Sequence, residues 1–352
     1  MVKALGLALY GPSAASHRVR LGQYCKGLAE AGIELNVQSL LGNEYLRSRF
    51  QGGPVPILHL LSAAFDRIRL LLSRRRFDIA IVHCELFPFL PWWLEQTALR
   101  IPFIYDLDDA FYLRYKLGRF AWLDPVLGRK FDQFMGAAAA ITAGNRHLAT
   151  YAGVFNENVT IFPSVVDTAN YVPNAHLKSP AFTVGWIGSP STAPYLESLV
   201  APLRTLGRER RLRFVVIGGE APFIEGIEVV EFQWSEETEV DLINTFDVGV
   251  MPLPDDEWAR GKCAFKLIQY MACGVPVVAS RVGANVDLVT EDCGFLVSTA
   301  EQWVDAITQL WEQPLMRINM GVASRKRAVD YYSLQSNLPI LSNVIRKVLD
   351  SH

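Results

Sequence analysis

Two lysines and a glutamine stand at helical spacing in the segment Gly261–Pro276. The apolar residues of this segment predict a helix from about Lys262 to Cys273, ended by a glycine. At about 100° per residue, Lys262, Lys266 and Gln269 share one face of that helix, opposite an apolar face. A helix N-terminus favours an anion and two lysines strengthen the preference, so this face predicts a site for a phosphate-bearing ligand. A solvated surface is the alternative interpretation of the lysines taken alone.

A second group of polar residues follows the predicted strand Ala4–Leu9, where another helix begins. Gly11 would let the backbone approach a ligand, and Ser13 and Arg18 lie where a helix start favours phosphate. A surface salt bridge explains Arg18 equally well, and it is the better explanation of Arg20. The segment lacks a Gly-x-Gly-x-x-Gly pattern, so the sequence gives no indication of a nicotinamide cofactor.

Short apolar runs that would position these residues alternate with amphipathic stretches along the whole chain. Such alternation predicts βαβ units, with parallel strands that are buried on both faces. Ligands of such sheets bind outside the carboxyl ends of the strands, where both segments above begin. The predicted strands are Ala4–Leu9, Glu34–Gln38, Asp78–Val82, Phe103–Asp106, Ala139–Thr142 and Val159–Phe162 in the first half, and Phe182–Ile187, Arg213–Ile217, Glu228–Val230, Asp247–Met251, Val277–Ala279 and Gly294–Val297 in the second.

Six strands in each half predict two doubly wound, Rossmann-like domains of the α/β class. A proline-containing stretch near residues 165–180 has no apolar periodicity and predicts a linker. We therefore expect an N-terminal domain over residues 1–170 and a C-terminal domain over residues 171–330. Residues 331–352 are expected to form a final helix that packs back toward the N-terminal domain.

Length, charge and cysteine content restrict the class of protein. The chain has 352 residues, more than one hydrophobic core usually holds, and its net charge of -2 gives no indication of nucleic acid as a partner. Its five scattered cysteines include no Cys-x-x-Cys, which predicts a reduced, cytoplasmic protein without a zinc site. The apolar N-terminal run is too short for a signal peptide, and no apolar run reaches the ~18 residues of a membrane span.

The decapeptide Met271–Ser280 resembles the donor-site motif of family-4-type retaining glycosyltransferases, which have the GT-B fold. Further segments resemble other motifs of that family in the expected order, namely the crossing between domains, a strand end and a closing strand. These segments are Ile161–Asp167, Arg213–Gly219 and Gly294–Val297, with Gly283 in a Gly-containing loop. The resemblance is strongest over residues 160–330. It implies two facing Rossmann-like domains with a deep cleft between them.

Both glutamates usual in the family's motif are absent. One of them contacts the donor sugar and the other the nucleotide ribose, and their positions hold Gly261 and Gln269 here. Gln269 can still hydrogen-bond a diol as a neutral group, and Glu257 on the adjoining loop is the candidate substitute for the first glutamate.

The family's usual Arg and Lys ligands of the pyrophosphate are also absent after the first strand of the second domain. Hydroxyl groups and loop amides would bind phosphate there, with Lys262 and Lys266 supplying the positive charge. The residues at this place are Gly188, Ser189, Ser191 and Thr192.

Three carboxylates end the predicted strand Phe103–Asp106 and the turn after it. The resemblance places this strand end beside the donor sugar and the acceptor, where a carboxylate would bind hydroxyls or stabilise charge at the anomeric carbon. Asp106 and Asp109 are the candidates, whereas helix capping explains Asp108 nearly as well. We disfavour an Asp-x-Asp metal site, because that site belongs to the other glycosyltransferase fold class.

An apolar stretch, Ile68–Leu72, precedes the basic run Arg74–Arg76, and Pro91–Trp93 lies not far along the chain. Together they predict peripheral contact with an anionic membrane at its inner face. An ordinary amphipathic helix with a charged end explains the first two segments about as well.

The resemblance implies transfer of a sugar from a UDP- or GDP-sugar donor to a hydroxyl acceptor, with retention and without a metal or other cofactor. The second domain would hold the nucleotide and the first the acceptor, which would be a glycan, a lipid-linked glycan or a small molecule. Two alternatives remain open. One is a catalytically inert subunit of the same fold that binds a nucleotide-sugar or a partner enzyme, as the lost glutamates suggest, and the other is a nucleotide-sugar 2-epimerase.

Overall fold

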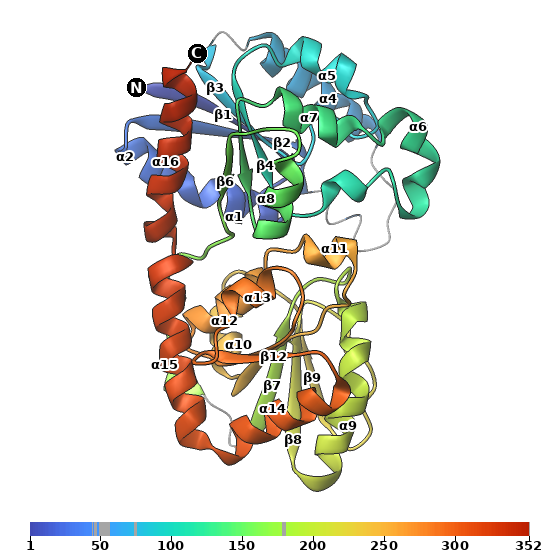
Figure 1. Ribbon diagram of the computed structural model, residues 1–352, viewed down its shortest axis with the longest axis vertical. Helices are drawn as coiled ribbons and strands as arrows, with labels where there is room; N and C mark the ends of the chain where they lie inside the picture. The colour runs from blue at the N-terminus through green and yellow to red at the C-terminus, as the bar shows by residue number, and fades with distance from the viewer. Residues whose placement is uncertain (44, 46–47, 49–56, 74–75, 178–180, 352) are drawn as a thin grey trace. The chain divides into compact units, whose positions relative to one another are not determined.

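The structure is a computed structural model that describes residues 1–43, 45, 48, 57–73, 76–177 and 181–351 (Figure 1). The chain forms two compact units. The first unit comprises Met1–Ser164, Gly261–Cys263 and Asn337–His352, and the second comprises Val165–Arg260 and Ala264–Ser336. The main divisions follow Ser164 and Ser336, and three residues from the middle of the second half belong to the first unit.

The first unit contains a parallel sheet of six strands in the order β2-β1-β3-β4-β5-β6. The strands are β1 Val2–Tyr10, β2 Ile33–Leu41, β3 Ile79–His83, β4 Phe103–Leu107, β5 Ala140–Ala143 and β6 Val159–Ile161. The helices include α1 Ala15–Arg20, α2 Cys25–Glu30, α4 Ile57–Leu72, α5 Trp92–Ala98, α6 Asp124–Leu127, α7 Lys130–Ala137 and α8 Arg146–Ala152, with α16 Leu334–Asp350 joining from Asn337 onward. Short 3-10 turns cover Gly22–Tyr24, Phe111–Leu113 and Gly118–Leu123.

The second unit contains another parallel sheet of six strands, in the order β12-β11-β10-β7-β8-β9. The strands are β7 Phe182–Ile187, β8 Leu212–Ile217, β9 Glu228–Phe232, β10 Val248–Met251, β11 Val277–Ser280 and β12 Gly294–Val297. The helices include α9 Val200–Glu209, α10 Glu239–Asn244, α11 Glu257–Arg260, α12 Phe265–Ala272, α13 Ala284–Leu288, α14 Ala300–Glu312 and α15 Pro314–Tyr331, with 3-10 turns at Ala175–Leu177 and Ala193–Leu199.

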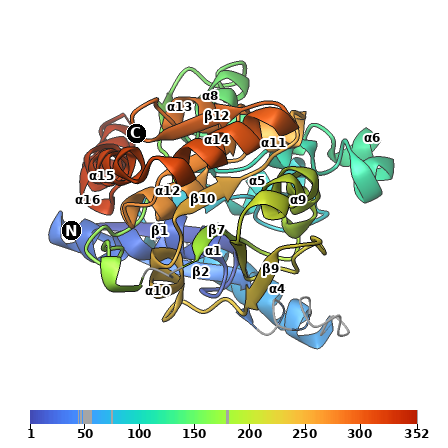
Figure 2. The same cartoon turned by 90° about the horizontal axis from the view of Figure 1, so that it is seen from below.

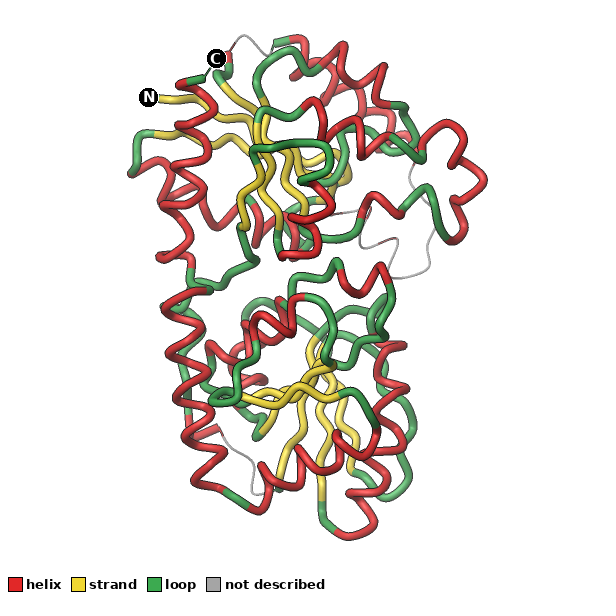
Figure 3. The backbone as a smooth tube through the Cα atoms, in the orientation of Figure 1, coloured by secondary structure: helices red, strands yellow, loops and turns green. Residues whose placement is uncertain are grey.

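Each sheet lies between helices (Figures 2 and 3). In the second unit, alternate residues of β8 enter different hydrophobic clusters. Val215 and Ile217 pack with α12, whereas Phe214 and Val216 pack with α9 and α14. Because successive side chains of a strand point to opposite faces, this sheet is buried on both faces, as the continuous apolar runs predicted. All twelve predicted strands and the two-domain α/β fold are confirmed.

The chain reverses its direction of winding at β7 in the second unit. From β7 the sheet grows through β8 and β9 on one side and through β10, β11 and β12 on the other. In doubly wound sheets, a ligand binds outside the carboxyl ends of the strands at such a switch point. The first unit has its corresponding point between β1 and β3. Among the described residues, no helix is long and apolar enough to cross a membrane.

Candidate functional site

Tyr270 of α12 fills the switch point of the second unit. Residues Val184 and Gly185 of β7 pair with β10, and beyond this pairing the hydroxyl of Tyr270 accepts a hydrogen bond from the Ile187 amide at 2.9 Å. The same hydroxyl lies 3.5 Å from the carbonyl oxygen of Val250. The side chain thus ties the last turn of α12 to the two central strands.

The helix itself begins later than the sequence predicts. Its first residue is Phe265, because Ala264 adopts a left-handed conformation with φ of 54°. The three residues before Ala264 belong to the first unit, where the Asn145 amide nitrogen donates to the carbonyl oxygens of Gly261 at 3.1 Å and Lys262 at 3.0 Å. Lys262 therefore lies outside the helix, and the predicted face shared by Lys262, Lys266 and Gln269 does not form.

Lys266 lies in the first turn of α12, next to the loop that follows β7. Its Nζ is 3.5 Å from the Thr192 hydroxyl and 5.2 Å from the centroid of the Trp186 ring. A side chain on Gly188 would collide with the Trp186 ring, since a Cβ there would come within 2.3 Å of it. Glycine at this position therefore lets the loop backbone pass close to the aromatic ring and the lysine.

The hydroxyl groups of this loop are close together. Ser189 Oγ and Ser191 Oγ are 2.9 Å apart, and Thr192 Oγ1 accepts a hydrogen bond from the Ser189 amide at 3.2 Å. Ser191 is exposed, and Ser189 and Thr192 are partly exposed. The structure thus brings Gly188, Ser189, Ser191, Thr192 and Lys266 together at the switch point, as a loop of hydroxyl groups beside one ammonium group.

Gln269 lies one turn further along α12 and is 4% exposed. Its amide nitrogen donates to the Tyr171 hydroxyl at 3.0 Å and to Glu239 Oε2 at 3.3 Å. Glu239 also accepts hydrogen bonds from the Tyr171 hydroxyl and, at 2.6 Å, from Trp234 Nε1. Burial and the Glu239 charge raise the pKa of Tyr171, so the phenol stays protonated and donates to the carboxylate. Gln269 is therefore part of a buried network of hydrogen bonds.

Asp106 at the end of β4 is 1% exposed and is bound on both oxygens. Arg20 donates to Oδ2 from Nε at 2.9 Å and to Oδ1 from its terminal nitrogen at 2.6 Å, and Thr142 donates to Oδ1 at 2.6 Å. Arg20 also donates to the carbonyl oxygen of Phe162 at 2.8 Å. Arg20 does form a salt bridge, as predicted, but the salt bridge is buried rather than on the surface. Through these bonds Asp106 joins β4 to α1 and β5.

The other two carboxylates of this strand end each have one basic partner. Asp108 Oδ1 is 2.9 Å from His83 Nε2, and Asp109 Oδ2 is 3.3 Å from Lys262 Nζ. Their side chains are 14% and 24% exposed, respectively. Burial raises the pKa of Asp109 even though the Lys262 charge opposes the rise. Two partly exposed carboxylates thus follow β4, one paired with the buried His83 at the end of β3 and the other with Lys262.

The remaining predicted residues are spread over other loops. Arg18 donates to the carbonyl oxygens of Pro12 at 3.2 Å and Ser13 at 3.0 Å, so it closes the turn after β1. The Ser13 amide donates to Asn43 Oδ1 at 3.0 Å, and a Cβ on Gly11 would come within 2.6 Å of that oxygen. Glu257 begins α11, has a side chain that is 58% exposed, and lies 3.9 Å from Arg260.

Sequence reasoning missed Tyr270, Tyr171, Glu239 and Asn145. Tyr270 lies in α12 directly before the decapeptide, where an aromatic residue is expected to be part of the hydrophobic core. Tyr171 and Glu239 are distant in sequence from Gln269 and meet it only through the fold. Only Asn145 could have been noticed from the sequence, because an Asn before a helix is a typical N-cap. In the structure its Oδ1 accepts a hydrogen bond from the Leu148 amide at 2.8 Å.

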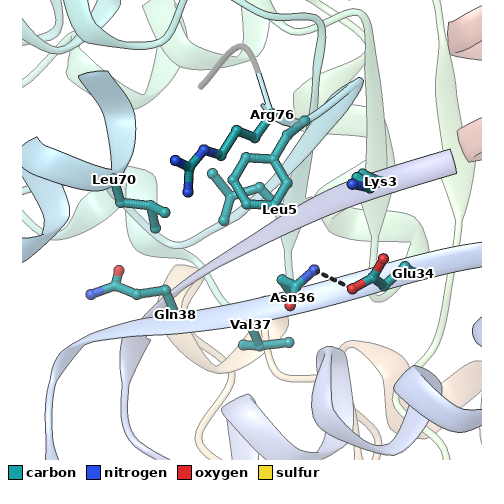
Figure 4. Close-up of a pocket in the computed structure, with 9 residues that line it drawn as sticks. Lys3, Leu5, Glu34, Asn36, Val37, Gln38, Leu70 and Arg76 are labelled. Atoms are coloured by element: carbon teal, nitrogen blue, oxygen red, sulfur yellow. Dashed lines mark hydrogen bonds between the residues drawn. The ribbon is translucent and has the colours of Figure 1, made fainter. Parts of the chain in front are cut away.

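A pocket of about 330 Å³ lies elsewhere on the first unit. Figure 4 shows that Lys3 and Leu5 of β1, Asn36 and Val37 of β2, and Leu70 of α4 line it. Its lining residues from β1 lie in the first half of that strand, away from the carboxyl end, so the pocket is separate from the predicted site. Within the described ranges, no group of three His, Cys, Asp or Glu side chains is placed to hold a metal ion. The five cysteines form no disulfide.

Residues 181–313 match the family model of glycosyl transferases group 1. Apart from Gly261–Cys263, the matched residues belong to the second unit, and the match covers less than half of the chain. It includes both the loop after β7 and helix α12. No curated protein matches the chain by sequence.

Solved structures resemble the chain over its whole length at low sequence identity. Sucrose-phosphate synthase from Thermosynechococcus elongatus has a TM-score of 0.74 at 13% identity, with 100% of both chains covered. HepE from Anabaena, in complex with UDP and glucose, has a TM-score of 0.66 at 13% identity, with 100% of both chains covered. WaaG, a glycosyltransferase involved in lipopolysaccharide biosynthesis, has a TM-score of 0.65 at 15% identity, with 98% of this chain and 99% of that chain covered. The chain has the fold of GT-B glycosyltransferases, and together the fold and the group 1 domain support a GT-B glycosyltransferase.

Proposed function

We propose that this chain transfers a sugar from a nucleoside diphosphate donor to a hydroxyl acceptor, and that the second unit binds the donor nucleotide. The observation that carries the proposal is the match of residues 181–313 to glycosyl transferases group 1, because those residues contain the loop after β7 and helix α12. The solved HepE complexes with UDP and with UDP-glucose support a uridine nucleotide as the first donor to test.

In this proposal, the loop from Gly188 to Thr192 and the Lys266 ammonium group hold the diphosphate. Loop amides and hydroxyl groups donate to phosphate oxygens, and Lys266 supplies the positive charge that a leaving diphosphate needs. Lys262 has a carboxylate partner in the first unit, so Lys266 carries the larger share of this role. Gln269 contacts the ribose only if its bonds to Tyr171 and Glu239 rearrange.

Asp109 is our first choice for the carboxylate that contacts the sugar or the acceptor. Its side chain is 24% exposed, whereas Asp106 is buried with both oxygens occupied. Asp109 lies at the carboxyl end of a strand in the first unit, which is the acceptor side in this proposal. Glu257 is exposed and remains the proposed substitute for the absent sugar-binding glutamate.

We also propose that the transfer proceeds with retention at the anomeric centre and without a metal ion. The chain would act on the cytoplasmic side, with peripheral membrane contact. The carboxylates of Asp106, Asp108 and Asp109 each have a basic partner within the first unit, which supports a role as hydrogen-bond acceptors rather than as metal ligands. Chelation by EDTA should leave the rate of transfer unchanged. Loss of activity in EDTA with recovery in manganese would contradict the metal-independent mechanism.

The decisive experiment incubates the purified full chain with a panel of UDP- and GDP-sugars and measures nucleotide release, with and without hydroxyl acceptors. Release that depends on acceptor, with a product of retained anomeric configuration by NMR, is the expected result. A nucleotide that raises the melting temperature without any turnover would favour the inert subunit, for which the absent glutamates are the specific evidence. Conversion of one nucleotide-sugar into its 2-epimer would favour the epimerase.

A further inference from the structure

Helix α4 of the first unit has an exposed apolar face in addition to its buried one. Leu61, Phe65, Ile68 and Leu72 are 63%, 65%, 47% and 71% exposed, and we call these four residues the α4 stripe. At about 100° per residue they fall within roughly 60° of one another. A surface helix usually has a single apolar face, which is turned toward the core, so a second one indicates a partner.

The buried face of α4 is fixed by Arg67. This guanidinium group is fully buried and donates to the carbonyl oxygens of Ala8 at 2.7 Å and Gln38 at 3.0 Å. Leu71 packs on the same side and is 1% exposed. Because a rotation of the helix would strand the buried guanidinium without acceptors, the α4 stripe cannot turn inward.

Basic residues accompany the stripe. Arg69 is exposed beside it, and the sequence continues directly into Arg74-Arg75-Arg76, of which Arg74 and Arg75 lie outside the described residues. Arg76 is exposed and lines the pocket next to Leu70 of α4, together with Lys3 (Figure 4). A stripe of large apolar side chains with arginines around it complements a surface that has both anionic groups and hydrocarbon.

Helix α5 packs against α4 and adds an aromatic residue to the same part of the unit. Trp93 of α5 is 61% exposed. Tryptophan favours the boundary between headgroups and hydrocarbon, because its ring is apolar and its N–H is polar. Helix α15 also has exposed apolar residues, but it differs from α4. Its row of apolar side chains is interrupted by Lys326, which pairs with Asp330 at 2.5 Å.

We propose that the α4 stripe, with Arg69, Arg76 and Trp93, docks the chain on the surface of an anionic phospholipid bilayer. The helix lies in the plane of the interface, its stripe enters the boundary of the hydrocarbon, and the arginines contact lipid phosphates. This inference deepens the membrane contact included in the proposed function by naming the surface that makes it. It rests on the exposed face of α4 and does not depend on the proposed reaction.

The test is sedimentation of the full chain with two kinds of vesicle, phosphatidylcholine alone and phosphatidylcholine with an equal amount of phosphatidylglycerol. The wild type should bind the anionic vesicles and be released by high salt. The double variant Phe65→Ser/Ile68→Ser should bind at least about tenfold more weakly, since it loses two apolar side chains from the interface. Arg69→Gln and Arg76→Gln should each weaken binding about fivefold.

The matched control is Ile318→Ser/Val322→Ser, which removes two exposed apolar residues from α15 and should bind as the wild type does. Equal melting temperatures and equal UDP binding would show that each variant is folded. The proposal is wrong if the wild type does not bind anionic vesicles, or if the α4 and α15 variants bind them equally well. A wild-type dimer that Phe65→Ser/Ile68→Ser dissociates, without any vesicle binding, would assign the stripe to a second copy of the chain instead. Absence of glycosyl transfer would leave the vesicle result unaffected.

Discussion

The carboxylates at the end of β4 each have a basic partner, and the degree of burial separates their roles. Asp106 and Arg20 are both 1% exposed and form a two-point salt bridge. Asp108 pairs with His83, Asp109 pairs with Lys262, and both carboxylates remain partly exposed. A buried carboxylate with its oxygens occupied costs much to disturb, whereas a partly exposed one can exchange its partner for a sugar hydroxyl. Chemistry in the first unit is therefore expected at Asp109 before Asp106.

Lys266→Ala should weaken the binding of a nucleoside diphosphate by about 1.5–3 kcal/mol, because it removes a charge-assisted hydrogen bond. Lys262→Ala should have a smaller effect, since Lys262 is held by Asp109 in the first unit and lies outside α12. Titration calorimetry of both variants with UDP measures the difference. Equal affinities for the wild type and Lys266→Ala would remove this lysine from the site.

The His83–Asp108 pair should make stability depend on pH. Burial lowers the pKa of His83, but the Asp108 charge and hydrogen bond outweigh it and hold that pKa above 6.5. Burial raises the pKa of Asp108, and the His83 charge and hydrogen bond outweigh this to hold it below 3.8. The stabilisation is therefore complete between pH 3.8 and 6.5, and is lost as pH rises through the folded pKa of His83 or falls through that of Asp108.

Urea unfolding of the wild type and of His83→Gln, measured from mildly acidic to mildly alkaline pH, tests this expectation. The free energy of unfolding of the wild type should fall with rising pH by more than that of the variant. Parallel curves would mean that the histidine is neutral throughout and that Asp108 pairs with it as a simple hydrogen-bond acceptor.

Helix α12 is positioned at both ends by backbone conformations that few residues adopt. Ala264 precedes it with φ of 54°, and Gly274 follows it with φ of 68°. Between them, the Tyr270 ring lies so close to Gly249 of β10 that a Cβ there would come within 2.3 Å of it. The element is thus fixed by its ends and by one aromatic contact, which places Lys266 beside the loop after β7.

Gly274→Ala should destabilise the second unit by about 1–2 kcal/mol, because an L side chain is strained in the left-handed region. Gly274→Asn should cost less, since asparagine tolerates that region better, although both would bring a Cβ to 3.2 Å from Pro173. Equilibrium unfolding in urea compares the two. If Ala and Asn cost the same, crowding against Pro173 dominates and the backbone conformation does not.

At the scale of the whole molecule, the last helix serves both units. Helix α16 starts in the second unit, and its residues from Asn337 onward belong to the first. There Leu338 lies against Gly27, where a Cβ would come within 2.4 Å of it, and Arg346 donates to the Ala31 carbonyl oxygen at 2.8 Å. The core of the first unit thus includes residues from the opposite end of the sequence.

Removal of residues 337–352 should unfold or strongly destabilise the first unit. The deletion takes away the buried side chains of Leu341, Val344, Ile345 and Val348, each worth on the order of 1.5–3 kcal/mol, a total comparable with the stability of a domain. The second unit should keep its fold and its nucleotide affinity. Hydrogen exchange measured segment by segment separates the units, and unchanged protection of β1 to β6 in the shortened chain would contradict the expectation.

The sequence by itself determined the two sheets and their strands, because buried parallel strands are continuous apolar runs that need no knowledge of distant residues. It also placed the segment Gly261–Pro276 before β11 and the loop from Gly188 to Thr192 after β7, since both follow directly from strand ends and a helix-ending glycine. Local spacing was enough for these features.

Tertiary structure alone decided which polar residues are paired and where α12 starts. Periodicity extended the helix back to Lys262, but Asn145, more than a hundred residues earlier, holds that backbone in the first unit. Likewise, Gln269 is tied to Tyr171 and Glu239, and Asp106 to Arg20, across long stretches of chain. A buried polar group must find a partner, but the partner is chosen by proximity in the folded chain, which the spacing of residues along one segment does not encode.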